Sequence, residues 1–148
     1  MKTQKKQSAK KYFAMKVVFL FLLLSSASFA QVAVIVNKSV PIKSAGASTI
    51  LDIYNLSSKE WSDGTQIIVI VLKNNEETAQ KFYEYLGTRP LTLKKIWMRA
   101  QLSGECKAPT SFSSEEEVVA KVASTPGAIG FVHEQYADSS VQTIAIIE

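Results

Sequence analysis

The sequence predicts an α/β fold in which a mixed, partly parallel sheet is flanked by helices. Short runs rich in Val and Ile alternate along the chain with helical patterns, which is typical of an α/β layer. The strongest run, IIVIVL at residues 67–72, is apolar throughout, as in a strand covered on both faces. The single Cys106 excludes an internal disulfide, so the chain must fold on a core of its own, and its length suits one compact domain.

Residues 1–30 are predicted to be a secretory signal peptide, and residues 31–148 the folded domain. Lysines precede the apolar run Val17–Leu24, and small residues then lead to Ala30. This run is far shorter than the roughly 20 apolar residues that a membrane-spanning helix needs. We expect cleavage after Ala30 and a periplasmic or secreted domain without a stable membrane anchor. The sequence leaves open whether translation begins at Met1 or at Met15.

Removing residues 1–30 also removes the basic character of the chain. The whole sequence carries 17 Lys and Arg residues against 13 Asp and Glu, but six lysines and no acid precede residue 31. The domain therefore holds 11 basic and 13 acidic residues, a net charge of −2. A mildly acidic surface gives no reason to expect a nucleic-acid or anionic-membrane partner.

The elements of the domain follow from local patterns. Strands are expected at 31–37, 67–72, 128–132 and 141–147, because these runs are β-branched and bounded by turn residues. One helix is expected at 47–54. Two amphipathic helices are expected in NNEETAQKFYEYLG and RPLTLKKIWMRAQLSG, and a further one in EEEVVAKVAS, capped by Ser113 or Ser114. The segment GECKAPTS reads as irregular, and Thr-Pro-Gly at 125–127 as an abrupt turn from helix to strand.

Four stretches, in order, resemble the phosphate-transport substrate-binding family, the periplasmic receptors of ABC phosphate importers. They are ILDIYNLSSKEWSDGTQI, FYEYLG, IWMRAQLSGECKAP and TPGAIGFV, within residues 32–137. The resemblance implies two α/β lobes that close on an anion in full-length members, and a single lobe of this periplasmic-binding-protein type here. It implies a binding protein rather than an enzyme, without a cofactor or metal. The implied ligand is inorganic phosphate or another small oxyanion, and the implied partner an ABC permease.

The family's anion loop, R-x-D-G-S-G-T, lies between a strand and the helix bearing F-x-x-Y-L. Glycines, hydroxyls and a helix N-terminus suit an oxyanion, because they present N–H and O–H donors to it. Aligned on Phe82, this chain has VLKNNEET, in which Thr78 alone matches the motif. The candidate ligand-binding residues are therefore Lys73, Asn74, Asn75 and Thr78.

The changed loop has a second interpretation, in which nothing binds. Glu76 and Glu77 replace the family's Ser and Gly, and each carboxylate stabilises a helix N-terminus by about 0.3–1 kcal/mol. Asn74 or Asn75 then caps the helix. A phosphate at this position meets like charge, so binding of phosphate with the affinity typical of the family is not expected.

The sequence thus leaves two functions open and disfavours a third. The chain is either a solute-binding domain, or an envelope structural or interaction domain that kept the lobe and lost the ligand. In the second case Cys106 leaves room for a covalent partner. A hydrolase is disfavoured, because no nucleophile motif is present and His133 has no companion. Trp61 and Trp97 are expected in the core, and Arg99 as a solvated charge.

Overall fold

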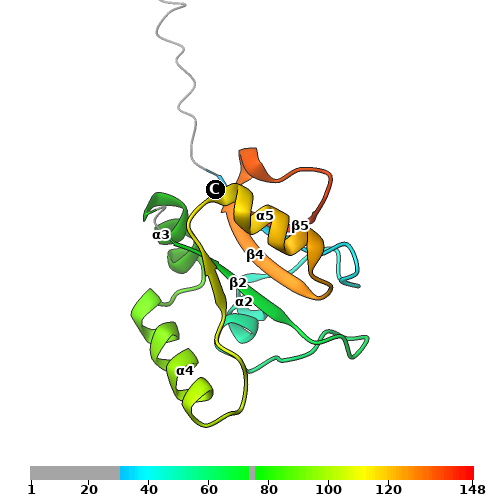
Figure 1. Cartoon of the computed structure of the whole chain (residues 1–148). Coiled ribbons are helices and arrows are strands. Elements are labelled where there is room, and N and C mark those ends of the chain that lie inside the picture. Colours follow the sequence, from blue (N-terminus) through cyan, green and yellow to red (C-terminus); the bar gives the residue numbers. More distant parts are fainter. Residues whose placement is uncertain (1–30, 74–75) are drawn as a thin grey trace, which may run out of the picture.

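The computed structural model describes residues 31–148 except Asn74 and Asn75, and it confirms the α/β class (Figure 1). The predicted signal peptide and both start sites lie outside the described residues. Within the described residues, the buried core runs from Val32 to Ile147. The elements in order are β1 (Val32–Val36), α2 (Ala47–Tyr54), β2 (Ile68–Leu72), α3 (Glu76–Tyr85), α4 (Pro90–Leu102), β3 (Thr110–Phe112), α5 (Glu115–Ser124), β4 (Ala128–His133), the 3-10 helix η1 (Glu134–Tyr136) and β5 (Gln142–Ile147).

The described strands form one mixed sheet in the order β3-β2-β4-β1-β5. Strand β2 pairs in parallel with β3 and β4, whereas β1 pairs antiparallel with β4 and β5. The register places Val32 opposite both His133 and Ile147. The start of β1 and the ends of β2, β3, β4 and β5 therefore meet along one side of the sheet, which we call the carboxyl edge.

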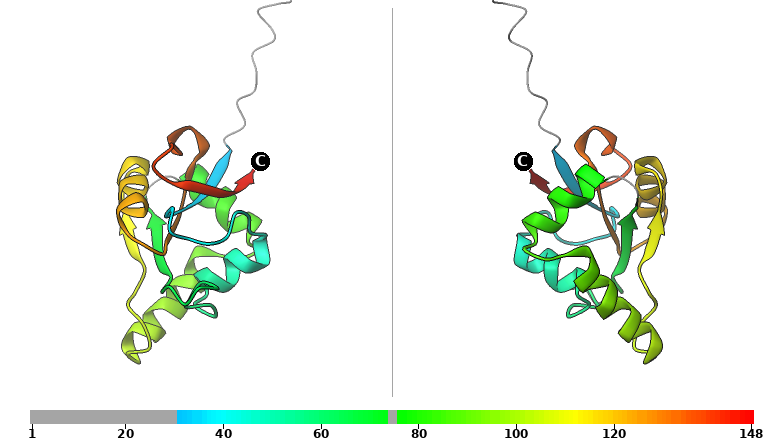
Figure 2. Two further views of the ribbon diagram at one scale, coloured as in Figure 1. Left: turned by 90° about the vertical axis from the view of Figure 1, so that its right-hand side faces the viewer. Right: turned by 90° about the vertical axis from the view of Figure 1, so that its left-hand side faces the viewer.

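Helices cover both faces of the sheet, with α5 on one face and α2 and α3 on the other (Figure 2). Adjacent residues of β4 pack against helices on opposite faces of the sheet, because side chains alternate between the two faces of a strand. A Cβ atom at Gly130 would lie 3.0 Å from the Val118 Cγ1 atom of α5, so glycine allows that helix to approach closely. On the other face the Phe131 ring stacks on Phe82 of α3, with 3.9 Å between centroids.

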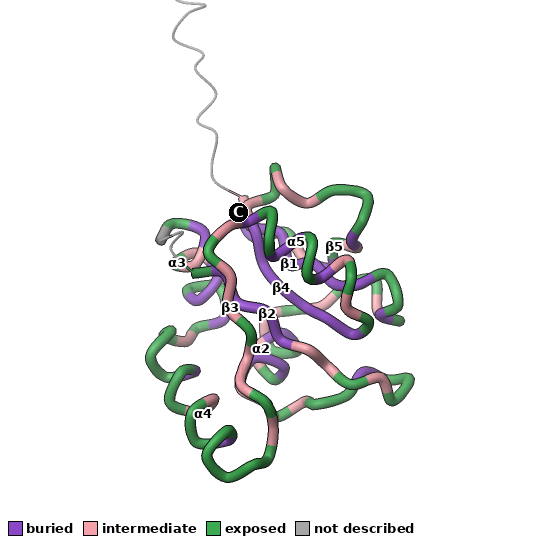
Figure 3. The backbone as a smooth tube through the Cα atoms, in the orientation of Figure 1, coloured by how far each residue is buried: buried purple, intermediate pink, exposed green. Residues whose placement is uncertain are grey.

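The core runs through the centre of the sheet. All five residues of β1 are fully buried, and most of β2 and β4 is buried too (Figure 3). The apolar stripes predicted for α3 and α4 also face inward, since Phe82 and Tyr83 of α3, Leu86 just after it and Leu93 of α4 are buried. None of the described helices is both long and apolar enough to cross a membrane.

Two elements differ from the sequence prediction. The segment predicted to be irregular contains the start of β3, which pairs with β2 from Thr110 to Phe112. A three-residue edge strand with one apolar side chain is too short to show a period of two, so its existence depends on pairing with β2. The short helix η1 was also not predicted. It follows β4 directly, and the Nδ1 atom of His133 accepts a hydrogen bond from the N–H of Gln135.

Candidate functional site

The predicted loop lies at the carboxyl edge, where β2 ends. Lys73 is exposed, and its backbone N–H donates to the Phe112 carbonyl at 2.7 Å, which ties the end of β2 to the end of β3. Asn74 and Asn75 lie outside the described residues, as does the side chain of Glu76. Thr78, in the first turn of α3, is 1% exposed. The structure therefore gives Lys73 and Thr78 different surroundings, one in solvent and the other in the core.

The Thr78 hydroxyl donates a hydrogen bond to a carboxylate of the same chain. Its partner is the Oε1 atom of Glu115, at 3.3 Å. The other carboxylate oxygen, Oε2, accepts from the backbone N–H of His133 at 3.0 Å. Glu115 is only 5% exposed. These contacts, which were not predicted from the sequence, join the starts of α3 and α5 to the end of β4.

Glu115 is held in place by the local structure of α5. Ser114 caps the helix, because its hydroxyl accepts from the Glu117 N–H while the Glu117 carboxylate accepts from the Ser114 N–H. Glu115 is the first residue of the helix and shares its buried face with Val118 and Val122. That spacing, i, i+3 and i+7, was the available sequence signal. It marks Glu115 as an inward-facing member of an apolar stripe, whereas Glu116 and Glu117 are exposed.

The carboxyl edge has the topology of a ligand crevice. After β2 the chain continues into α3 on one face of the sheet, and after the adjacent β3 it continues into α5 on the other. Ligands of open α/β sheets bind at such reversals, outside the carboxyl ends of the strands. Two helix N-termini point here, and each favours negative charge. In this chain the Glu115 carboxyl group lies at that place.

The other residues singled out in the sequence have mainly structural surroundings. Trp61 is buried, and its indole N–H donates to the Gly127 carbonyl at 2.9 Å. Trp97 is half-buried and donates to the Tyr54 carbonyl at 2.6 Å. Trp61 therefore lies in the core as predicted, whereas Trp97 packs against the core but is only partly buried. Arg99 is exposed in the last turn of α4, which agrees with a solvated charge.

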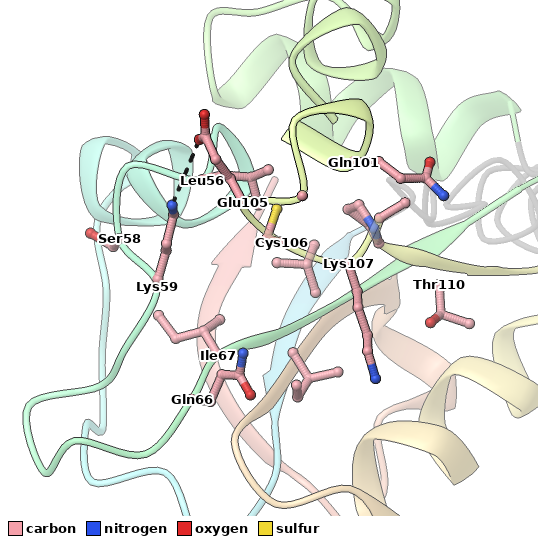
Figure 4. Close-up of a pocket in the computed structure, with 15 residues that line it drawn as sticks. Leu56, Ser58, Lys59, Gln66, Ile67, Gln101, Glu105, Cys106, Lys107 and Thr110 are labelled. Carbon is pink, nitrogen blue, oxygen red and sulfur yellow. Dashed lines mark ion pairs between the residues drawn. The ribbon is translucent and has the colours of Figure 1, made fainter. Parts of the chain in front are cut away.

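The described residues also line a cavity of about 800 Å³ at the opposite end of the parallel strands (Figure 4). Ile68 and Thr110, the first residues of β2 and β3, border it, as does the half-buried free thiol of Cys106. At its rim an exposed ion pair joins Lys59 and Glu105 at 3.9 Å. Despite its volume, we do not take this cavity as the site. The helix N-termini and the Thr78 donor lie at the carboxyl edge instead.

Solved structures share this fold. A protein from Clostridium perfringens, assigned as a phosphate ABC transporter substrate-binding protein and solved with bound phosphate, matches 78% of this chain at a TM-score of 0.64 and 21% identity. An ABC-type phosphate transport receptor from Vibrio cholerae matches 82% at a TM-score of 0.59 and 17% identity. PstS from Borrelia burgdorferi matches 79% at a TM-score of 0.56 and 16% identity.

These matches confirm the resemblance at the level of the fold. The chain spans about half the length of each solved protein, 45%, 51% and 48% respectively. A single lobe of the periplasmic-binding-protein type accounts for that share and for the five-stranded sheet. No family model matches the sequence, and no curated protein matches it either.

Proposed function

We propose that this chain is an exported, solute-binding-protein-like lobe whose binding of phosphate is weakened or lost. The fold supports a lobe of this kind, since the matched structures are phosphate receptors or substrate-binding proteins by name. The observation that carries the weakened binding is the contact between Thr78 and Glu115. Thr78 is the loop residue that matches the family motif, and its hydroxyl donates to a carboxylate inside the protein.

The charge at the carboxyl edge supports the same conclusion. A phosphate that approached Thr78 would lie close to the Glu115 carboxylate, and two anions in a poorly hydrated site repel strongly. The exposed Lys73 lies next to this edge and keeps a cation available to a weakly held oxyanion. The proposed ligand class is therefore a small oxyanion bound weakly, with inorganic phosphate as the reference compound. Lys73, Asn74, Asn75 and Thr78 remain the proposed loop residues.

We propose binding rather than catalysis, and export rather than retention in the cytoplasm. The names of the matched structures describe transport receptors and substrate-binding proteins. A periplasmic or secreted location, reached after cleavage near Ala30, fits such a role, and an ABC permease is the corresponding partner. No step of this proposal requires a cofactor or a metal.

A thermal-shift series on residues 31–148 tests the proposal. Phosphate, sulfate and chloride are compared at millimolar concentration and matched ionic strength, so that general salt effects cancel. A ligand at a hundredfold excess over its Kd stabilises a fold by about 2.7 kcal/mol, which shifts the Tm by several degrees in a domain of this size. We expect at most a small shift with phosphate. A shift of several degrees with phosphate alone would show that the site binds the family ligand well.

An envelope interaction domain is the second candidate, and the surface of α4 favours it. Leu91, Met98 and Leu102 are 62%, 53% and 86% exposed, and their spacing places them along one side of the helix. Exposed apolar side chains in one stripe are typical of a surface that contacts a protein. If α4 contacts an envelope protein, the double variant Met98→Ser, Leu102→Ser is expected to move the exported chain out of the envelope fraction. The control double variant Glu76→Ser, Glu77→Gly is expected to leave the chain in that fraction.

A further inference from the structure

Glu115 is a buried carboxylate that the chain itself supplies to the carboxyl edge. It is 5% exposed, and both of its oxygens accept hydrogen bonds. Oε1 accepts from the Thr78 hydroxyl at 3.3 Å, and Oε2 from the His133 backbone N–H at 3.0 Å. Both side-chain oxygens of Glu115 therefore act as hydrogen-bond acceptors, as the oxygens of an ionised carboxylate do.

The donors around Glu115 are of the kind that hold small oxyanions in proteins. A hydroxyl and a backbone N–H converge on it, and Thr78 belongs to the first turn of α3. Backbone N–H groups of a first helical turn lack partners within the helix and favour a negative charge. A carboxylate tethered to α5 therefore meets the same chemistry as a free anion would meet.

We propose that Glu115 acts as a built-in anion. It accepts the hydrogen bonds of the Thr78 hydroxyl and the His133 N–H, and so excludes free oxyanions from the carboxyl edge. This inference rests on the proposed function, because it names the residue that weakens oxyanion binding there. Glu115 is then a specificity-determining residue. Replacing it with a small side chain creates a site for a carboxylate-sized or phosphate-sized oxyanion between α3, α5 and β4.

Two physical effects give the proposal its expected result. Removing the carboxylate takes away the acceptor that the Thr78 hydroxyl and the His133 N–H share in the structure, and losing a hydrogen-bond partner is costly for a donor held away from water. It also removes the charge that repels a second anion and leaves space of the size of that carboxylate. Formate carries the same functional group without the tether, so it is the closest probe for the vacated position, and phosphate is the larger one.

The experiment compares residues 31–148 with the variants Glu115→Ala and Glu116→Ala. Glu116 is the matched control, because it lies in the same first turn of α5 but is exposed. Each protein is titrated with sodium formate and with sodium phosphate against sodium chloride at equal ionic strength, and the Tm is recorded. We expect Glu115→Ala to have a lower Tm in chloride and a saturable rise with formate. We expect it to bind at least one of the two anions ten times more tightly than the unmodified protein and Glu116→Ala do.

Each outcome decides between the two proposals. A folded Glu115→Ala that gains no binding of formate or phosphate overturns the role of Glu115, and leaves the proposed function standing if the unmodified protein also binds poorly. Tight phosphate binding by the unmodified protein overturns the proposed function, and it overturns the role of Glu115 as well when Glu115→Ala binds equally tightly.

A double-mutant cycle tests the proposal if Glu115→Ala does not fold in chloride, formate or phosphate. Glu115→Gln keeps the side-chain volume, and Thr78→Val removes the hydroxyl while keeping the shape. If the carboxylate and the hydroxyl act on each other, the Tm changes of the two substitutions are not additive. Additive changes would overturn the proposal, because Glu115 would then act independently of the Thr78 donor.

Discussion

At the scale of single residues, Gly127 shows how a local turn organises distant parts of the chain. It has a positive φ of 76°, and its carbonyl accepts from the Trp61 indole while its N–H donates to the Ser39 hydroxyl. The sequence predicted the abrupt turn at Pro126 and Gly127. It could not predict the crowding, since a Cβ atom at Gly127 would lie 2.2 Å from the Gln66 carbonyl oxygen.

Gly127→Ala is therefore expected to destabilise the fold by more than about 3 kcal/mol. The left-handed backbone alone costs a non-glycine residue about 1–2 kcal/mol, and the clash with backbone at Gln66 adds to it. Gly64→Ala is the control, because Gly64 also has a positive φ, 83°, but has open space around it. Urea unfolding of both variants measures the difference. Equal losses in the two variants would contradict the importance of the close contact.

Two buried tyrosines are expected to make the folded domain less stable at alkaline pH. Burial raises the pKa of Tyr83 to about 12, and burial together with the nearby Tyr83 raises the pKa of Tyr54 well above its usual value. The unfolded chain loses these protons near pH 10, whereas the folded chain retains them. Their contribution to stability is thus complete below pH 10 and falls as the pH rises from 10 toward 12.

Tyr83→Phe is expected to make the free energy of unfolding fall less steeply with pH above 10. One titrating group is removed, so about 1–2 kcal/mol of the loss between pH 9 and pH 12 disappears. Urea unfolding at several pH values measures the slope. Tyr85→Phe, near the end of the same helix, controls for the loss of a tyrosine hydroxyl. An unchanged slope in Tyr83→Phe would contradict the raised pKa.

At the scale of elements, α5 is fixed at both ends. Ser114 and Glu117 form the capping box at its start, and Glu115 ties this end to α3 and β4. At its other end the Asn37 amide donates to the carbonyls of Val122 and Ala123, both at 2.8 Å. The sequence predicted the cap and the acidic first turn. The hydrogen bonds from Asn37 join residues far apart in the chain, so they could not be predicted from local patterns.

Ser114→Ala is expected to lower the free energy of unfolding by about 1 kcal/mol, the usual loss for a helix cap. The Glu117 N–H then lacks the hydroxyl that accepts its hydrogen bond. Ser113→Ala is the matched control, because residue 113 contacts Glu117 through its backbone N–H, which alanine keeps. The two variants are compared by thermal and urea unfolding. If Ser113→Ala costs as much as Ser114→Ala, the cap is not the cause.

At the scale of the whole molecule, the order of the elements was predictable, whereas the contacts at the carboxyl edge were not. Apolar runs identified β1, β2, β4 and β5, and helical stripes identified α2 to α5, because these patterns reflect burial by neighbours of any kind. The edge strand β3 and the inward Glu115 depend on particular tertiary partners. The loop motif identified Thr78 as a candidate. The hydrogen bond from its hydroxyl to Glu115 forms because α3 and α5 meet at the carboxyl edge, which the sequence does not show.

The amide signal of His133 tests the central claim most directly. A nitrogen-labelled sample of residues 31–148 is titrated with phosphate to 10 mM at constant ionic strength, and the backbone amide shifts are followed. Because the His133 N–H already donates to Glu115, we predict that its signal does not move beyond the small changes seen with chloride. A saturable shift of that signal with phosphate in the unmodified protein would contradict the claim, since it would show a free oxyanion at the donors assigned to Glu115.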